Sequence, residues 1–384
     1  MNALKDVFTS TGSKFFAHQE AMINLRNGKG QAITTHLMPT DLCQDTCAFC
    51  SVATRDGKVL RFDDMISYVE IVQRFGLKSV IISGGGNPLL YKCPVTKQGI
   101  SELILALVRR GLEIGLITNG MPLKDYGGRR SYVTLSLEAL DSLAWIRVSM
   151  AGLDHPRESV EVPDIDTTKT TLGFSYVLHD IYDEPADLNH GKVSTLHDLH
   201  SRENIQGRAI YAVDRIPKLT EQIREVVVKH RPAYVRLLPN CLEPHLIAAR
   251  CELLANMAQL IDPEVAFVQY KPPSAPNACY LGYIHPVLNS DGYVYPCDSV
   301  VLAVADLGYK AGVPDHRFAN PWRVCHWSEI AGLYEAPVRS LIKDPKTQCP
   351  GCVFPKSNLL LEEVVEGRVE PVAPSEQPLH VNFV

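Results

Sequence analysis

The sequence predicts an α/β protein: a partial (β/α)6 TIM-like barrel followed by a small C-terminal α+β domain. Between residues 31 and 238, short apolar runs alternate with longer segments of helical periodicity, which is the pattern of parallel strands joined by helices. The apolar runs number six, fewer than the eight strands of a closed barrel. Beyond Pro272, Pro273 and Pro276 the composition changes and cysteines become frequent, which indicates a second, smaller domain.

The elements of the barrel can be placed from these patterns. Strands are expected at 31–37, 79–83, 113–118, 145–149, 171–178 and 234–238. Helices are expected at 63–75, 100–110, 217–230 and 245–261. The third helix would begin on Pro217, whose missing N–H costs nothing in a first turn, and end on His230, which suits the helix dipole. The polar stretch 180–208 has little periodicity, and we interpret it as a surface loop or lid that could cover an active site.

The chain is therefore expected to have four parts. An N-terminal segment occupies 1–30, the partial barrel 31–240, the cysteine-bearing domain 241–369 and a tail 370–384. The tail contains three prolines and ends in LHVNFV, a composition compatible with a docked extended segment or with disorder.

Composition narrows the class of protein. With 384 residues, of which 46% are hydrophobic and 21% charged, the chain is expected to be globular. The formal net charge of −5 provides no basic surface for a long nucleic acid, although it does not exclude a single nucleotide. We recognise no secretion signal, and no apolar run approaches the roughly 18 residues of a membrane span, so we expect a cytoplasmic protein without a membrane partner. Eleven cysteines in such a protein favour ligation of iron–sulfur or zinc over disulfides.

Three cysteines follow the first expected strand. The segment DLCQDTCAFC places Cys43, Cys47 and Cys50 in a short loop at the mouth where barrel enzymes keep their chemistry. Their spacing lets one loop wrap three thiolates around a cubane and leave the fourth iron open to a ligand. A structural zinc site would need a fourth ligand nearby, and no His or Cys follows within the next forty residues.

This loop resembles the CxxxCxxC motif of the radical S-adenosylmethionine (SAM) superfamily, including the aromatic Phe49 before the last cysteine. The resemblance extends over residues 31–240, where Arg236 and Pro239 are similar to the end of the family's barrel. It implies a [4Fe–4S] cluster whose open iron chelates the amino and carboxylate groups of SAM, and an electron donor of the flavodoxin or ferredoxin type. It also implies cleavage of SAM to methionine and a 5′-deoxyadenosyl radical.

The resemblance assigns residues to the methionine part of SAM. The second strand ends in SGGGNPLL, which is similar to the family's glycine-rich turn, so the backbone at Gly84, Gly85 and Gly86 is expected to approach the methionine closely. Asn87 stands where the family usually has Glu, and its amide oxygen can accept a hydrogen bond from the ammonium, more weakly than a carboxylate would. A plain turn between strand and helix is the alternative interpretation.

Two further residues are expected to contact the ribose of SAM. The family places Asn or Ser at the ends of the third and fourth strands, where the segments LITNG and RVSMAG supply Asn119 and Ser149. Taken alone, Asn119 would indicate a turn and Ser149 a strand-end hydroxyl. We identify no catalytic acid, base or nucleophile from the sequence.

A second group of cysteines lies beyond the barrel, at Cys279, Cys297, Cys325, Cys349 and Cys352. The segment between the first two predicts a β-hairpin with strands at 285–288 and 293–295. This arrangement resembles the SPASM/Twitch extension, in which a hairpin supplies two cysteines and a later CxxC completes an auxiliary cluster. The resemblance implies an α+β iron–sulfur domain with one auxiliary [4Fe–4S] cluster on Cys279, Cys297, Cys349 and Cys352, and thus two clusters in the chain. Cys325 is left over or replaces one ligand, and a zinc ribbon with four cysteine ligands is the alternative.

The function that follows is that of a radical SAM enzyme of the oxidoreductase or isomerase type. We expect it to abstract hydrogen from a small-molecule or nucleotide-linked substrate, which is then oxidised, isomerised or rearranged. The alternative is cross-linking or epimerisation of a ribosomal peptide, although about 30 residues before the first strand are too few for a separate leader-binding domain. A zinc-stabilised binding protein without redox chemistry is the alternative from another class.

Overall fold

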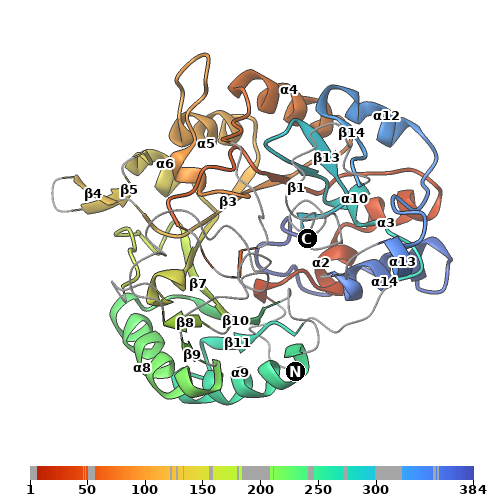
Figure 1. The fold of residues 1–384 in the computed structure, drawn as a ribbon. Helices are drawn as coiled ribbons and strands as arrows, with labels where there is room; N and C mark the ends of the chain where they lie inside the picture. Colours follow the sequence, from red (N-terminus) through yellow and green to blue (C-terminus); the bar gives the residue numbers. More distant parts are fainter. Residues whose placement is uncertain are drawn as a thin grey trace.

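A ten-stranded sheet forms the centre of the computed structural model (Figure 1). Its strands are adjacent in the order β11-β10-β7-β6-β3-β2-β1-β12-β13-β14. The structure describes residues 7–45, 47, 49–50, 57–121, 123–126, 129–132, 134–154, 159–179, 181–183, 208–210, 212–240, 246–270, 276–298, 322–348, 352 and 354–384.

The barrel wall consists of parallel strands: β1 (Thr34–Leu37), β2 (Ser79–Ile82), β3 (Glu113–Thr118), β6 (Trp145–Ser149), β7 (Thr171–Leu178), β10 (Tyr234–Pro239) and β11 (Ala266–Val268). All six expected strands are confirmed, and β3, β6 and β7 have the expected bounds. The sequence pattern does not predict β11, because three residues are too few to show an alternation. Among the described residues β11 and β14 form the two edges of the sheet and do not pair with each other, so the barrel is open and the partial-barrel prediction is confirmed.

Four long helices follow strands and pack on the outside of the sheet: α4 (Phe62–Gln73), α5 (Ile100–Val108), α8 (Ala212–His230) and α9 (Ile247–Ile261). They match the expected helices except at the start of α8. This helix begins five residues before Pro217, which lies inside it, so the prediction that Pro217 opens the helix is wrong. The additional residues include Arg215, which forms an ion pair with the buried Asp154. This ion pair stabilises the first turn of α8, which the sequence pattern does not predict.

The structure also describes further helices and two separate strand pairs. They are α2 (Gly12–Ala17), α3 (Gln19–Arg26), α6 (Leu137–Asp141), α10 (Leu281–Ile284), α12 (Ile330–Glu335), α13 (Pro345–Gln348), α14 (Pro355–Val365), the 3-10 helices η1 (Pro88–Leu90), η2 (Met150–Asp154) and η6 (Trp327–Glu329), and the strand pairs β4 (Leu123–Tyr126) with β5 (Arg129–Tyr132) and β8 (Ile181–Asp183) with β9 (Arg208–Ile210). Most of the stretch interpreted as a lid, 184–207, lies outside the described residues.

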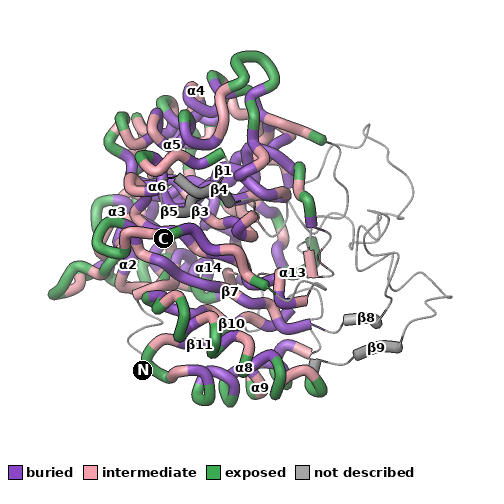
Figure 2. The backbone as a smooth tube through the Cα atoms, turned by 90° about the vertical axis from the view of Figure 1, so that its left-hand side faces the viewer, coloured by how far each residue is buried: buried purple, intermediate pink, exposed green. Residues whose placement is uncertain are grey.

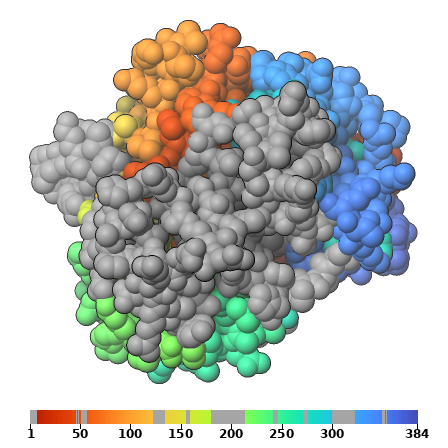
Figure 3. All heavy atoms as spheres, in the orientation of Figure 1, coloured from red at the N-terminus to blue at the C-terminus, as the bar shows by residue number. Residues whose placement is uncertain are grey.

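The cysteine-bearing region packs directly on the barrel. Its expected hairpin is confirmed as β12 (Val287–Leu288) and β13 (Tyr293–Tyr295), followed by β14 (Cys325–His326). β12 lies parallel to β1, so the hairpin continues the sheet of the barrel. α12 packs on α4, where the rings of Phe75 and Tyr334 stack 4.8 Å apart, and the two regions meet along the upper edge of the molecule in Figure 3.

The C-terminal tail is docked against the start of the barrel strands. Of the two interpretations of its composition, the docked extended segment is therefore confirmed and disorder is wrong. The hydroxyls of Thr34 and Ser79 donate to the carbonyl oxygen of Asn382 over 2.6 and 2.5 Å. His285 Nδ1 lies 2.6 Å from the carbonyl oxygen of Val384. Figure 2 shows the C-terminus next to buried segments, with the exposed sides of α8 and α9 turned to solvent. The core of the barrel is therefore covered at this end.

Gly173 tests the packing of the barrel wall. A Cβ atom at this position would lie 2.1 Å from Cζ of the buried Tyr234, whose ring also stacks on Phe8 at 4.3 Å and has little room to move. We expect Gly173→Ala to lower the free energy of unfolding by about 1–3 kcal/mol through overpacking, measured by urea denaturation. Gly332→Ala is the control, because a Cβ there meets open space in helix α12 and should be neutral or stabilising. Equal losses in the two variants would contradict this account.

Candidate functional site

The three cysteines of the first motif lie in the loop after β1, where all are partly buried. The Cys50 N–H donates to the Cys47 carbonyl over 2.9 Å, which bends the loop back on itself. Burial raises the pKa of the Cys47 thiol well above its ordinary value, and Cys50, Asp45, Cys43 and Asp154 raise it further. Thiolates in one short, partly buried loop repel one another, and bound iron supplies the positive charge that removes this repulsion. The donor set therefore fits a cationic iron–sulfur group.

The glycine-rich turn after β2 lies against this loop. A Cβ atom on Gly86 would come within 2.1 Å of the Leu42 carbonyl oxygen and 2.5 Å of the Asp41 carbonyl carbon, so only glycine fits. The next residue, Asn87, donates its backbone N–H to the same Leu42 oxygen over 2.7 Å. Gly84 is less restricted, since its nearest neighbour would be the Thr40 oxygen at 3.2 Å. The turn thus fixes the backbone that leads into Cys43.

The side chain of Asn87 is buried and fully hydrogen-bonded. Its Oδ1 accepts from the Leu89 N–H at 3.2 Å and from the Thr118 hydroxyl at 2.8 Å. Its Nδ2 donates to the Met121 carbonyl at 2.8 Å and to Gln44 Oε1 at 3.3 Å. Asn87 therefore connects the glycine-rich turn, the end of β3 and the cysteine loop.

Asn119 also contacts the cysteine loop. Its Nδ2 donates to Asp45 Oδ2 over 2.6 Å and lies 3.9 Å from the Cys43 sulfur, and its Oδ1 accepts from Gln44 Nε2 over 3.2 Å. Ser149 stands apart at the end of β6, where its hydroxyl accepts from the Ala151 N–H over 3.4 Å. The structure thus brings together the cysteine loop, the glycine-rich turn and Asn119, and leaves Ser149 outside this network.

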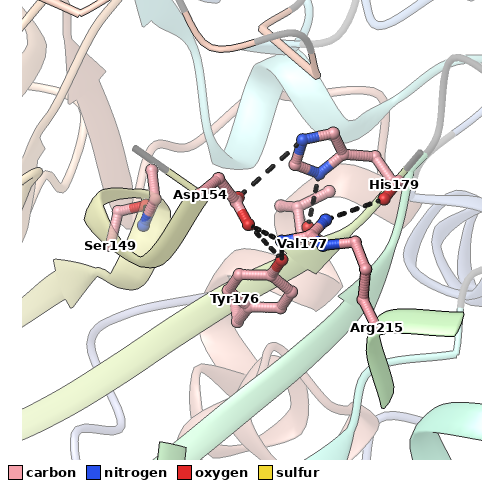
Figure 4. Close-up of polar contacts among 7 residues, drawn as sticks. Ser149, Asp154, Tyr176, Val177, His179 and Arg215 are labelled. Carbon is pink, nitrogen blue, oxygen red and sulfur yellow. Dashed lines mark hydrogen bonds and ion pairs between the residues drawn. The ribbon is translucent and has the colours of Figure 1, made fainter. Parts of the chain in front are cut away.

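A group of polar side chains that the sequence analysis does not single out lies on the other side of the loop. This Asp154 cluster consists of Asp154, Tyr176, His179 and Arg215 (Figure 4). Asp154 Oδ1 accepts from the Tyr176 hydroxyl over 2.6 Å and from Arg215 Nη2, and Oδ2 lies 3.8 Å from His179 Nε2. Arg215 also donates to the His179 carbonyl over 3.2 Å, so the guanidinium joins the ends of β6 and β7 to α8.

The Asp154 cluster touches the cysteine loop directly. The ring of Phe49 meets the His179 ring edge-on, with centroids 4.8 Å apart. Burial and the Asp154 carboxylate raise the pKa of Tyr176 well above its ordinary value, so the phenol remains a hydrogen-bond donor at neutral pH. Only a weak sequence signal indicates the Asp154 cluster. Polar residues lie at the carboxyl ends of β6 and β7, and the cysteine loop lies at this edge of the sheet.

The second cysteine group is partly described. Cys279 and Cys297 pack in one small hydrophobic cluster with Tyr295. The buried Asn358 of α14 donates to the Cys352 sulfur over 3.7 Å, and its Oδ1 accepts from the N–H groups of residues 280 and 281 at 3.0 Å each. This amide links Cys352 to the segment just after Cys279. Cys349 lies outside the described residues.

Cys325 has different surroundings. It lies on β14 and packs against the main core of the barrel, in another cluster than Cys279 and Cys297. Burial, and then Glu329, raise the pKa of its thiol to about 12, so it remains protonated at neutral pH. Within the described parts of the chain, no group of three or more His, Cys, Asp or Glu side chains is arranged as the ligand set of a single metal ion.

Among known protein families, the radical SAM superfamily has a model that matches residues 37–164 of this chain. The matched region begins in β1, contains the cysteine loop, the glycine-rich turn, Asn119 and Ser149, and extends beyond Asp154. The match supports the superfamily that the CxxxCxxC motif indicated, and a [4Fe–4S] cluster and SAM are the groups that this family implies.

Curated relatives match about a third of the chain or less. The GTP 3′,8-cyclase of Staphylococcus saprophyticus is 32% identical over 122 residues, which cover 27% of this chain and 34% of that protein. The probable GTP 3′,8-cyclase of Saccharolobus solfataricus is 25% identical over 137 residues, 35% of this chain and 36% of that protein. The matched segment spans about a third of the length of these relatives.

Two solved structures can be compared with the course of this chain. SuiB of Streptococcus suis bound to S-adenosylmethionine is 13% identical, with a TM-score of 0.44 over 82% of this chain and 71% of that one. Native anSMEcpe with bound AdoMet and Cp18Cys peptide is 14% identical, with a TM-score of 0.48 over 88% of this chain and 98% of that one. Separately, no helix in the described ranges is long and apolar enough to cross a membrane.

Gly86 offers a test of how the region that matches the superfamily model holds its cysteine loop. A methyl group at this position must displace the backbone at Leu42, so we expect Gly86→Ala to lower the free energy of unfolding by about 1–3 kcal/mol and to reduce iron uptake on anaerobic reconstitution. Iron per chain and the urea midpoint are the measurements.

Gly99→Ala is the matched control, because its Cβ would meet Glu102 Oε2 at 3.4 Å and the Tyr91 oxygen at 3.6 Å, which are ordinary contacts. If Gly86→Ala binds as much iron as Gly99→Ala and unfolds at the same urea concentration, the turn does not position the loop.

Proposed function

We propose that this protein is a radical SAM enzyme that reductively cleaves SAM and abstracts hydrogen from a small-molecule or nucleotide-linked substrate. The observation that carries the proposal is the loop of Cys43, Cys47 and Cys50, held between the glycine-rich turn and the Asp154 cluster inside a region that matches the superfamily. A cytoplasmic location and an electron donor of the flavodoxin or ferredoxin type are parts of this proposal that rest on the sequence alone.

The residues proposed to hold the cofactors follow from their positions. Cys43, Cys47 and Cys50 would ligate the [4Fe–4S] cluster, which, when bound, supplies the electron that cleaves SAM. The backbone at Gly84–Gly86 would line the methionine site, with Asn119 and Ser149 on the ribose side. Because Asn87 Oδ1 already accepts two hydrogen bonds, a methionine ammonium would have to replace one of them.

The Asp154 cluster would shape the other wall of the site. It contains one carboxylate, one guanidinium, a phenol and an imidazole, so its buried charges are paired. A paired cluster of this kind fixes the ends of β6 and β7 and holds Phe49 in place through the His179 ring. We propose that this arrangement orients the loop and excludes water from the side of Cys47.

We further propose a SPASM/Twitch-like auxiliary [4Fe–4S] cluster on Cys279, Cys297, Cys349 and Cys352. The shared packing of the first two, and the Asn358 amide that links Cys352 to the segment after Cys279, support this ligand set. The separate position of Cys325 in the main core supports leaving it out. With four thiolates such a cluster has no open iron, so it would accept electrons or act as a structural clamp.

A nucleotide-linked substrate has support from the curated relatives, which are named as GTP 3′,8-cyclases. These matches cover only 35% and 27% of this chain, so the oxidation, isomerisation or rearrangement that follows hydrogen abstraction is left open within the proposal. Iron analysis separates it from the zinc-stabilised binding protein: about eight iron and eight sulfide per chain support the enzyme, and stoichiometric zinc in colourless protein contradicts it.

The first cluster can be removed by substitution. We expect Cys43→Ala, Cys47→Ala, Cys50→Ala to abolish 5′-deoxyadenosine formation from SAM under dithionite, because the loop contains no other thiol. Cys251→Ala is the control, since Cys251 lies on α9, away from both cysteine groups, and should retain iron and activity. Formation of 5′-deoxyadenosine by the triple variant would show that another site cleaves SAM.

The auxiliary cluster is tested by Cys349→Ala, Cys352→Ala. We expect iron to fall from about eight to about four per chain, with 5′-deoxyadenosine formation retained if this cluster accepts electrons. A product two electrons more oxidised than the substrate would then be lost, because the substrate radical could not transfer its electron.

If the cluster is instead a structural clamp, the melting temperature and all activities should fall together. The control is Cys325→Ala, which should keep the iron content of the wild type. Unchanged iron in the Cys349→Ala, Cys352→Ala variant would remove the auxiliary cluster from the proposal.

A further inference from the structure

A cavity of about 390 Å³ lies on the inner face of the sheet, away from the cysteine loop. Residues of β1, β6 and β10 form its wall, with His36, Arg147 and Arg236 among them, and the docked tail contributes Phe383. Its volume falls within the range of small-molecule sites. None of the SAM-binding residues proposed above lines it.

The register of the sheet places the two arginines on the same face. Arg147 of β6 pairs with Gly173 of β7, and Arg236 of β10 pairs with Ser175, two residues further along the same strand. Side chains two residues apart on a strand point to the same face, so both guanidinium groups flank β7 on the cavity side. Their partners on β7 are the small residues Gly173 and Ser175, and the ring of Tyr234 packs over Gly173.

The cavity wall is strongly cationic. Lys14 and Lys356 line it together with the two arginines, whereas Asp298 is the one carboxylate among its described lining residues. Burial lowers the pKa of Lys14 to about 8, so most of its molecules still carry a charge at neutral pH.

The three histidines at the wall, His36, His285 and His380, add no charge. Burial lowers the pKa of His36 and that of His380 to about 4, in His36 against the effect of Asp298, and burial lowers the pKa of His285 as well. The lining therefore contains four cationic side chains, of which Lys356 is exposed, and one carboxylate, and a bound anion would offset the excess positive charge.

Two polar atoms at the wall are buried without a hydrogen-bond partner among the described residues. They are Nε of Arg147, which is a donor, and Nε2 of His285. His285 Nδ1 donates to the carbonyl oxygen of Val384 at 2.6 Å, so Nε2 of the neutral ring is an acceptor. Buried polar groups are rarely left unpaired, so Nε of Arg147 indicates a ligand with a hydrogen-bond acceptor.

The cavity wall is connected to segments that carry the proposed cofactor residues. His36 is hydrogen-bonded to Ser83, the residue before Gly84. The lining residue Asp298 follows Cys297, and the lining residue Phe354 comes two residues after Cys352.

We infer that this cavity binds the anionic end of the substrate, a phosphate or carboxylate group, through Arg147 and Arg236. The inference rests on the proposed function for calling the ligand a substrate, but anion binding itself does not depend on SAM cleavage. Arginine's planar fork donates two parallel hydrogen bonds to either group, which suits the two guanidinium groups flanking β7.

The test is calorimetric titration of the reconstituted protein, under anaerobic conditions, with inorganic phosphate and separately with succinate. We expect binding of one of them by the wild type and a loss of about tenfold to a hundredfold in Arg147→Gln and in Arg236→Gln, the usual cost of a charged hydrogen bond. Arg147→Lys should restore part of the affinity because it keeps the charge without the fork. Arg224→Gln, on the exposed face of α8, is the control and should bind like the wild type.

The two anions distinguish the source of the charge: tighter binding of phosphate supports a phosphorylated substrate, and tighter binding of succinate a carboxylate. Melting temperatures identify variants that fail to fold. If Arg147→Gln is one of them, Arg147→Lys and Arg236→Gln decide the result. Equal affinities in the wild type and all folded variants, or no binding of either anion, would overturn the inference. Loss of SAM binding in Arg147→Gln with unchanged phosphate affinity would also overturn it. Failure of the wild type to form 5′-deoxyadenosine would instead contradict the proposed function.

Discussion

The candidate site depends on one close backbone approach, that of Gly86 to Leu42. The carbonyl of Leu42 accepts the N–H of Asn87 over 2.7 Å, which is feasible only because residue 86 has no side chain. From this contact the Asn87 amide extends to Thr118, and Asn119 extends to Asp45. A short irregular loop is thereby held by two neighbouring strand ends before any cofactor binds, and such preorganisation is what a ligand site requires.

On its opposite side, the cysteine loop lies against the buried ion pair of Asp154 and Arg215. Removing Asp154 and Arg215 from water is costly, and the cost is offset only while both partners and the Tyr176 hydroxyl keep their geometry. The cluster therefore resists small displacements of β6 and β7, and the aromatic contact between Phe49 and His179 passes this rigidity to the loop. The cysteines thus lie between a tightly packed backbone and a tightly paired polar cluster.

Much of the barrel could be predicted from the sequence, because buried parallel strands such as β3, β6 and β7 are short, mostly apolar runs with sharp ends. The cysteine loop and the hairpin were predictable from spacing and turn residues. The Asp154 cluster was not, since its four members come from separate segments and only the fold brings them together. The start of α8 was missed for the same reason: a tertiary ion pair at Arg215 outweighed the local signal of Pro217.

The pairing of β12 with β1 has a consequence for how the molecule assembles. His36 and Val287 are partners in this pairing, although about 250 residues of chain separate them, whereas β2 on the other side of β1 follows within about 45 residues. During synthesis one edge of β1 must stay unpaired until the chain has been made as far as Leu288. An unpaired strand edge can pair with strands of other chains. Nascent or truncated chains that end before β12 should therefore be the aggregation-prone forms of this protein.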